Sequence, residues 1–221
     1  MESLDMLANN LANTGTSGFK ADREFYSVYQ AALPMIERHW TDFSQGDLVP
    51  TGNPLNLGLS GQGFFALTSP AGVVYSRNGE FRISRANQLE TAEGFTLRNT
   101  RDQFRPITVN PALAIDIDKD GVVRQGAQEI GQIEIVGIEQ ASVALRKQGN
   151  SYFALSSAGV TPAPAAGVEI RQSTLEQSNV PVADAAIRLV SVMRQFEMLQ
   201  RALLLGAEMN RKAIDEVARV A

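Results

Sequence analysis

Cysteine is absent from this 221-residue sequence, and histidine occurs only once, at position 39. The lack of cysteine excludes disulfides, zinc–thiolate sites and thiol nucleophiles. It fits either a cytosolic protein or an export route that does not use oxidative folding. A single histidine cannot build a multi-histidine metal site. It also leaves only one residue that could serve as the histidine of a catalytic triad. Because His39 adjoins Trp40, we interpret it as a packing or surface residue.

Long apolar runs and blocks of positive charge are also missing. No apolar run reaches the ~20 residues that a membrane-spanning helix needs. The N-terminus lacks the positively charged and apolar regions of a cleaved signal peptide. The net charge of −4, without a basic block, gives no electrostatic attraction to nucleic acid or anionic lipid. With 44% hydrophobic and 20% charged residues, the chain has ordinary globular composition and is long enough for one large or two small domains.

The last forty or so residues carry the clearest helical pattern. From Ala185 onward, apolar or small residues recur in alternating steps of four and three, which is typical of a heptad seam. The seam comprises Leu189, Val192, Phe196, Leu199, Leu203 and Gly206, and it continues through Asn210, Ala213, Val217 and Val220. Asn179 is a candidate N-cap, Pro181 suits the first turn, and Asp184 favours the positive helix end.

Such a helix would be about 60 Å long, which exceeds the width of a domain of this size. We therefore predict that it pairs with another helix as a coiled coil. The alternative is an amphipathic helix that lies on the core of its own domain.

The N-terminal residues repeat the same spacing over a shorter length. Leu4, Leu7 and Leu11 predict the tail of a helix that ends in the glycine-rich turn before Phe19. Since isolated helices shorter than ~12–15 residues are marginal, we expect further helical residues upstream. We also expect this helix to pair with the C-terminal one. Residues 21–33 could be helix or strand, and no regular structure is expected for residues 45–57.

The period changes to two between residues 57 and 177, where short apolar runs alternate with turn residues. The pattern predicts an antiparallel β-sandwich or irregular barrel, so the fold class is α+β. A turn at residues 69–72 joins two runs, and Asn78-Gly79 predicts a type I′ hairpin turn. We divide the chain into an N-terminal helix end and turn (1–20), a connector (21–56), a β domain (57–177) and a C-terminal coiled-coil helix (178–221).

Two local patterns resemble ligand sites. Residues 116–121 match the first half of a calcium-binding EF-hand loop, with acids at positions 1, 3 and 5 and glycine at 6. Position 12, however, is Ala127 instead of glutamate, and an acidic turn that closes a hairpin explains the same residues. Residues 58–63 are rich in glycine without forming a phosphate-binding loop. We expect these glycines to allow close strand packing or a bulge.

No group of residues points to catalysis. Carboxylates are plentiful, for example Glu80, Glu90, Glu93, Asp102 and Glu134, but nothing singles out a glycosidase pair. No nucleophile with a recognisable base is present. We predict a protein that is not an enzyme and that uses no cofactor or metal.

Three separated blocks closely resemble signatures of bacterial flagellar axial proteins, the rod, hook and hook-associated proteins. The first block is Leu7-Ala8-Asn9-Asn10-Leu11-Ala12-Asn13-Thr14, followed by Ser17-Gly18-Phe19-Lys20 and Phe25. The second comprises residues 51–57, Gly61-Gln62-Gly63-Phe64-Phe65 and Tyr75-Ser76-Arg77-Asn78-Gly79-Glu80-Phe81. The third is residues 175–180 with Arg194-Gln195-Phe196-Glu197. They cover nearly the whole chain in the family's order, and they look most like the proximal-rod type within the FlgF/FlgG/hook family.

The resemblance implies a structural subunit of the flagellar basal-body rod that polymerises through its terminal helices. It further implies type III export without a cleaved signal peptide, location in the rod across the periplasm, and contacts with itself and other rod subunits, with ring proteins and peptidoglycan as further candidates. A distal-rod or hook-type subunit, a cell-wall-binding scaffold and a wall-cutting hydrolase are the alternatives. The assembly residues would be Leu4, Leu7, Leu11, Leu189, Val192, Phe196, Leu199 and Leu203. The family-motif residues would be Asn9, Asn10, Asn13, Gly18, Phe19, Gly61, Gly63, Phe64, Asn78 and Gly79.

Overall fold

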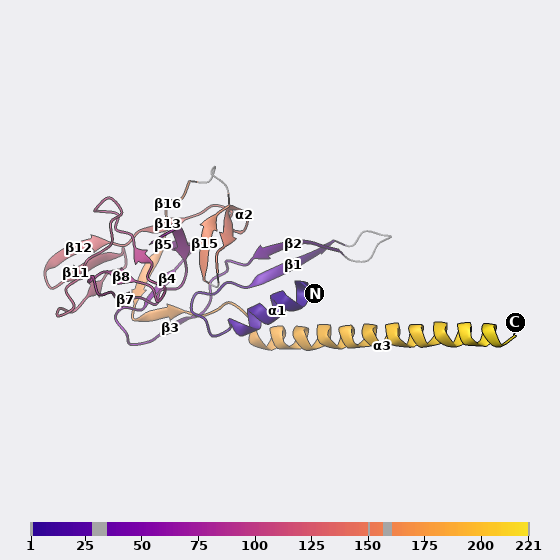
Figure 1. The fold of residues 1–221 in the computed structure, drawn as a ribbon. Helices are drawn as coiled ribbons and strands as arrows, with labels where there is room; N and C mark the ends of the chain where they lie inside the picture. The colour runs from indigo at the N-terminus through magenta and orange to yellow at the C-terminus, as the bar shows by residue number, and fades with distance from the viewer. Residues whose placement is uncertain (1, 28–34, 150, 157–160, 221) are drawn as a thin grey trace. The chain divides into compact units, whose positions relative to one another are not determined.

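A computed structural model describes residues 2–27, 35–149, 151–156 and 161–220 (Figure 1). The chain divides into two units. The helical unit consists of Met1–Leu11 and Pro181–Ala221, and the β unit consists of Ala12–Val180. The fold is α+β, as the change of sequence period predicts.

The helical unit contains two of the chain's helices, α1 (Glu2–Ala12) and α3 (Val182–Val220). The long C-terminal helix is confirmed, and α3 runs for 39 residues. Its first turn is closed by a 2.9 Å hydrogen bond from the Ala185 N–H to the Pro181 carbonyl. The prediction that Asn179 caps this helix is wrong, because its side-chain amide bonds the carbonyl of Asp42 and its side-chain oxygen accepts from the Ala21 N–H. The coiled-coil pairing of α1 with α3 stays a prediction.

The β unit is built from short strands and one short helix, α2 (Ala141–Ala144). The first strands are β1 (Asp22–Ser27), β2 (Met35–Thr41), β3 (Leu48–Pro50), β4 (Leu57–Ser60), β5 (Phe64–Ser69), β6 (Gly72–Ser76), β7 (Arg82–Ile83), β8 (Leu89–Glu90) and β9 (Thr96–Leu97). The later strands are β10 (Asp116–Ile117), β11 (Val122–Gln125), β12 (Gln128–Gln132), β13 (Ile135–Gly137), β14 (Leu145–Lys147), β15 (Tyr152–Leu155), β16 (Ala163–Pro164), β17 (Glu169–Gln172) and β18 (Thr174–Glu176).

The largest sheet has nine strands, in the order β14-β15-β6-β5-β9-β8-β7, with β13 and β16 joined to it through β5. Smaller sheets are β1-β2, β10-β11-β12, β17-β4 and β18-β3. Every strand pair among the described residues is antiparallel, which confirms the predicted antiparallel β domain. The core is apolar and includes Phe65, Leu67, Leu97 and Val123, each fully buried.

Strands also occur in the connector. Residues 22–27 form β1, which settles part of the helix-or-strand alternative, and residues 28–34 lie outside the described residues. The expectation that residues 45–57 lack regular structure is wrong at Leu57, which begins β4, and at β3. Leu175 of β18 pairs there with Val49, so a segment distant in sequence supplies the partner that a local pattern does not show.

The predicted turns have mixed outcomes. The turn at 69–72 is confirmed, because β5 and β6 pair with Ser69 opposite Gly72. The Asn78-Gly79 hairpin is wrong, since β6 pairs with β5 and β15 whereas β7 pairs with β8. Neither Asn78 nor Gly79 has positive φ. Gly79 instead allows a close crossing, because a Cβ there would lie 1.7 Å from the Leu57 carbonyl oxygen.

The acidic turn at 116–121 closes the β10–β11 hairpin. The Asp118 carboxylate accepts hydrogen bonds from the N–H groups of Asp120 and Val122 at 3.1 and 2.9 Å, and it pairs with Arg124. In the described part of the chain, no three His, Cys, Asp or Glu side chains gather as a metal site would require. No helix there combines the length and apolar character needed to cross a membrane.

Candidate functional site

A buried group of three charged side chains joins the three sequence blocks inside the β unit. The Lys20 ammonium lies 2.6 Å from Oε1 of Glu176, and the Arg77 Nε lies 3.0 Å from Oε2. The Lys20 and Glu176 side chains are fully buried, and Arg77 is only 3% exposed. We call Lys20, Arg77 and Glu176 the charge triad. It connects residues that lie 57 and 99 positions apart in sequence.

Backbone groups supply further hydrogen bonds to the triad, whereas Oε2 of Glu176 has no hydrogen bond and only the ion-pair contact with Arg77. Lys20 also donates to the Ser44 carbonyl at 2.6 Å, and Oε1 of Glu176 accepts from the Gly46 N–H at 2.9 Å. The Arg77 Nη1 donates to the carbonyls of Gly61 and Gly63 at 2.8 and 2.7 Å. Such bonds are needed because taking charges out of water costs several kcal/mol per ion.

Burial is the main influence on the ionisation of the two cations. It lowers the pKa of Lys20 below its usual 10.5, and the Glu176 carboxylate opposes this by attraction and hydrogen bonding. Burial likewise lowers the pKa of the Arg77 guanidinium, again opposed by Glu176. The two cations therefore stay charged because Glu176 and the backbone carbonyls compensate for their burial.

The triad ties the segment after α1 to the segment before α3. The Gly18 N–H donates to the Glu176 carbonyl at 2.7 Å, and the Asn179 side-chain oxygen accepts from the Ala21 N–H at 2.8 Å. Gly18 has φ +66, and a Cβ there would lie 2.3 Å from the Arg77 carbonyl carbon. Residues 18–21 and 176–179 thus lie against each other within the β unit.

The other motif residues pack around this contact or belong to α1. Phe19 is fully buried, with the Lys147 ammonium 4.1 Å from its ring centroid. Phe64 is 5% exposed, and the glycines on either side of Gln62 admit the backbone and side chains of residues 135 and 165–168, as close packing predicts. Asn10 and Asn13 are nearly buried, at 6% and 7% exposed.

The predicted assembly residues differ in exposure along the two helices. In α1, Leu7 is buried, and Leu4 and Leu11 are half-buried. In α3, Leu189 and Val192 are half-buried, whereas Phe196, Leu199 and Leu203 are exposed by 43%, 64% and 74%. Further exposed apolar side chains lie off the seam: Ile187, Val190, Met193, Met198, Leu204, Leu205 and Met209. The apolar surface of α3 is therefore wider than the heptad seam.

Sequence reasoning included the triad within the motifs but gave its members no role. The available signal was the presence of charged residues in blocks that are otherwise mostly uncharged, although the second and third blocks also contain other charged residues, such as Glu80 and Arg194. A local pattern cannot pair them, because their partners come from distant segments.

Two family models match parts of this chain, which include Arg77 and Glu176. Residues 58–125 match the family described as flagellar hook protein FlgE/F/G D1 domain, and residues 171–216 match flagellar basal body rod FlgEFG protein C-terminal. The chain is 29% identical to the flagellar basal-body rod protein FlgF of Caulobacter vibrioides, over 98% of this chain and 92% of the relative.

Two further relatives show similar coverage. FlgF of Mesorhizobium japonicum is 28% identical, over 88% of this chain and 83% of the relative. The rod protein FlgG of Buchnera aphidicola subsp. Schizaphis graminum is 25% identical, over 95% of this chain and 92% of the relative.

Proposed function

Because the chain belongs to the FlgE/F/G family of flagellar hook and basal-body rod proteins, we infer that it is a structural, non-enzymatic subunit of the basal-body rod. The FlgF relatives are 26–29% identical and the FlgG relatives 23–27%, and the two highest of these identities belong to FlgF proteins, which supports our proposal of the proximal-rod type over a distal-rod or hook-type subunit.

We propose further that the subunit polymerises through α1 and α3. The observation that supports this is the exposed apolar surface of α3, which a helix in water does not maintain without a partner. Burial of each large side chain offers roughly 1.5–3 kcal/mol before entropy is counted. Seam residues Leu4, Leu7 and Leu11 of α1 and Leu189, Val192, Phe196, Leu199 and Leu203 of α3 are the proposed contacts. Heterologous contacts of this kind between like subunits lead to open helical assemblies.

The triad supports the proposal that α1 and α3 take part in polymerisation together, because it connects the segment after α1 to the segment before α3. We also propose, from the family resemblance, export without a cleaved signal peptide and contacts with ring proteins or peptidoglycan. For the functional division of the chain, we propose an N-terminal helix end and turn (1–20), a connector (21–56), a β domain (57–177) and a C-terminal coiled-coil helix (178–221).

Replacement of two seam residues tests polymerisation. We expect Phe196→Ser combined with Leu199→Ser to abolish motility when it replaces the native protein, because both side chains lose their apolar contacts. The unfolding midpoint of the β unit, followed by circular dichroism, should stay unchanged.

The matched control is Met198→Ser with Leu204→Ser, two residues of the same helix with similar exposure, 62% and 69%, that lie off the seam. We expect it to reduce motility less than the seam variant. Normal motility of the seam variant would refute polymerisation through this seam.

A further inference from the structure

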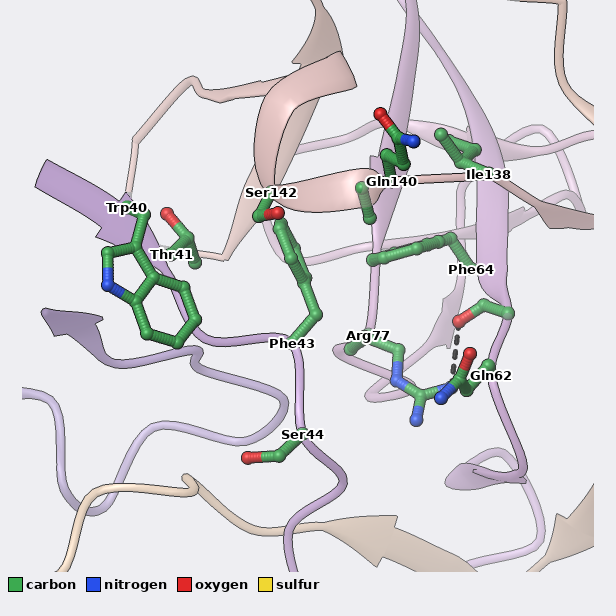
Figure 2. Close-up of a pocket in the computed structure, with 12 residues that line it drawn as sticks. Trp40, Thr41, Phe43, Ser44, Gln62, Phe64, Arg77, Ile138, Gln140 and Ser142 are labelled. Atoms are coloured by element: carbon green, nitrogen blue, oxygen red, sulfur yellow. Dashed lines mark hydrogen bonds between the residues drawn. The ribbon is translucent and has the colours of Figure 1, made fainter. Parts of the chain in front are cut away.

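The β unit contains a cavity of about 300 Å³ that the proposed assembly does not use. It lies between the end of β2, residues 62–64 and the segment from Ile138 to Ser142 (Figure 2). All its lining residues belong to the β unit.

Both apolar and polar side chains line this cavity (Figure 2). Trp40, Phe43, Phe64 and Ile138 form the apolar part, and the rings of Phe43 and Phe64 meet edge to face with centroids 5.4 Å apart. The side chains of Gln62, Gln140 and Ser142 lie at the cavity with no hydrogen bond to any residue that the structure describes. They are therefore available to a ligand.

The electrostatic character of the cavity is positive. None of its lining residues carries a carboxylate, and Arg77 supplies the only formal charge in its wall. The Arg77 Nε and Nη1 are used by Glu176, Gly61 and Gly63, which leaves the Nη2 donors without a hydrogen bond among the described residues.

The buried residues behind the wall do not cancel this charge. The triad has two cations and one carboxylate. The Asp42 carboxylate also attracts Lys20, but it is itself paired with Arg23 at 2.7 Å. An anionic group in the cavity would balance the surplus positive charge next to the buried Arg77 guanidinium.

We propose that this cavity binds a carboxylate next to a large apolar side chain, presented by an acidic segment of another protein chain. The apolar group packs on Phe43, Phe64 and Trp40, and the carboxylate accepts from the free Arg77 donors. Gln140 and Ser142 at the rim pair with peptide N–H and C=O groups. We propose an acidic partner because its negative charge complements the positive charge of Arg77. The cavity volume suits one or two anchor side chains. The proposal does not depend on polymerisation through α3.

Trp40 makes the test direct, because it is the only tryptophan in the chain and it lines the cavity. The full-length protein is titrated with phenylacetate, and then with phenylacetamide, its neutral analogue of nearly equal shape. We expect phenylacetate to change the tryptophan emission saturably and to bind at least about tenfold more tightly than the amide, with an affinity that falls as salt is added. Equal affinities, or no saturable change with either compound, would overturn the proposal.

Two further experiments test the kind of ligand and the position of the site. N-acetylglucosamine should give no saturable change, and saturable binding of this sugar without binding of phenylacetate would replace the proposal with a glycan site. Gln140→Leu with Ser142→Ala should weaken binding of an acetylated Asp-Phe dipeptide about threefold to tenfold, because rim hydrogen bonds are lost. Gln128→Leu, at an exposed position in β12, is the matched control and should leave binding unchanged. An equal effect of both variants would contradict the assigned site.

Discussion

Several single residues in this protein stabilise the fold through contacts with residues that are distant in the sequence. Lys20, Arg77 and Glu176 come from different parts of the chain, and nevertheless both cations form ion pairs with the Glu176 carboxylate at 3.0 Å or less. Their burial makes their energetics asymmetric. One carboxylate pairs with both cations, so its loss leaves two buried positive charges unpaired, whereas loss of one cation leaves a neutral ion pair.

This asymmetry predicts unequal effects of substitutions in the triad. We expect Glu176→Gln to lower the free energy of unfolding by about 3–5 kcal/mol, and Lys20→Met to lower it by less. Urea unfolding of the full chain, followed by Trp40 fluorescence, measures both.

Glu169→Gln is the control, because Glu169 and Lys119 form an exposed pair at 3.8 Å whose loss should cost under about 1 kcal/mol. A cost for Lys20→Met above that for Glu176→Gln would contradict the charge balance described above.

The elements show where local signals suffice and where they fail. The heptad spacing correctly indicates α3, and period two correctly indicates antiparallel strands. The Asn-Gly pair at 78–79 does not make a hairpin, because β6 finds its partners in β5 and β15. Gly79 is needed for another reason, which is the passage of its backbone against Leu57.

Gly79→Ala therefore tests a crossing between elements. The added methyl group would meet the Leu57 carbonyl oxygen and strain the 2.9 Å hydrogen bond from the Leu57 N–H to the Gly79 carbonyl. We expect a loss of about 1–3 kcal/mol or more in the free energy of unfolding, measured by urea denaturation.

Gly15→Ala provides the comparison, since nothing lies within 4 Å of a Cβ at that exposed position. It should change stability by less than about 0.5 kcal/mol. Similar losses for both glycine variants would rule out the close crossing as the cause.

At the scale of the whole molecule, the chain combines a β unit with a large apolar core and a helical unit whose longer helix is mostly exposed. Few buried contacts hold α3 beyond its first turns in the monomer, so local opening should be frequent there.

Limited proteolysis of the purified monomer tests this difference. Trypsin should cut first after exposed basic residues of α3, such as Arg194 and Arg201, and a resistant core should remain. Exposed Arg82 in the β unit is the internal control and should be cut later. Mass spectrometry identifies the fragments. Equal protection of residues 182–221 and the β unit would argue that α3 packs on its own globule, against assembly through free ends.

The sequence by itself determined the features that arise from neighbouring residues. The spacing of Leu189 through Leu203 sets the helix, alternation sets the strands, and Asp118 with Gly121 closes a turn through hydrogen bonds at short range. The motif blocks also indicate the family, because that resemblance depends only on the identity and order of the residues.

Only the tertiary structure decided which distant groups meet. The pairing of Val49 with Leu175, the crossing at Gly79 and the triad of Lys20, Arg77 and Glu176 all join residues many positions apart. Periodicity describes which face of an element is apolar, but it does not say which other element covers that face. Burial then turns ordinary charged residues into partners that depend on one another, since an unpaired charge away from water is costly.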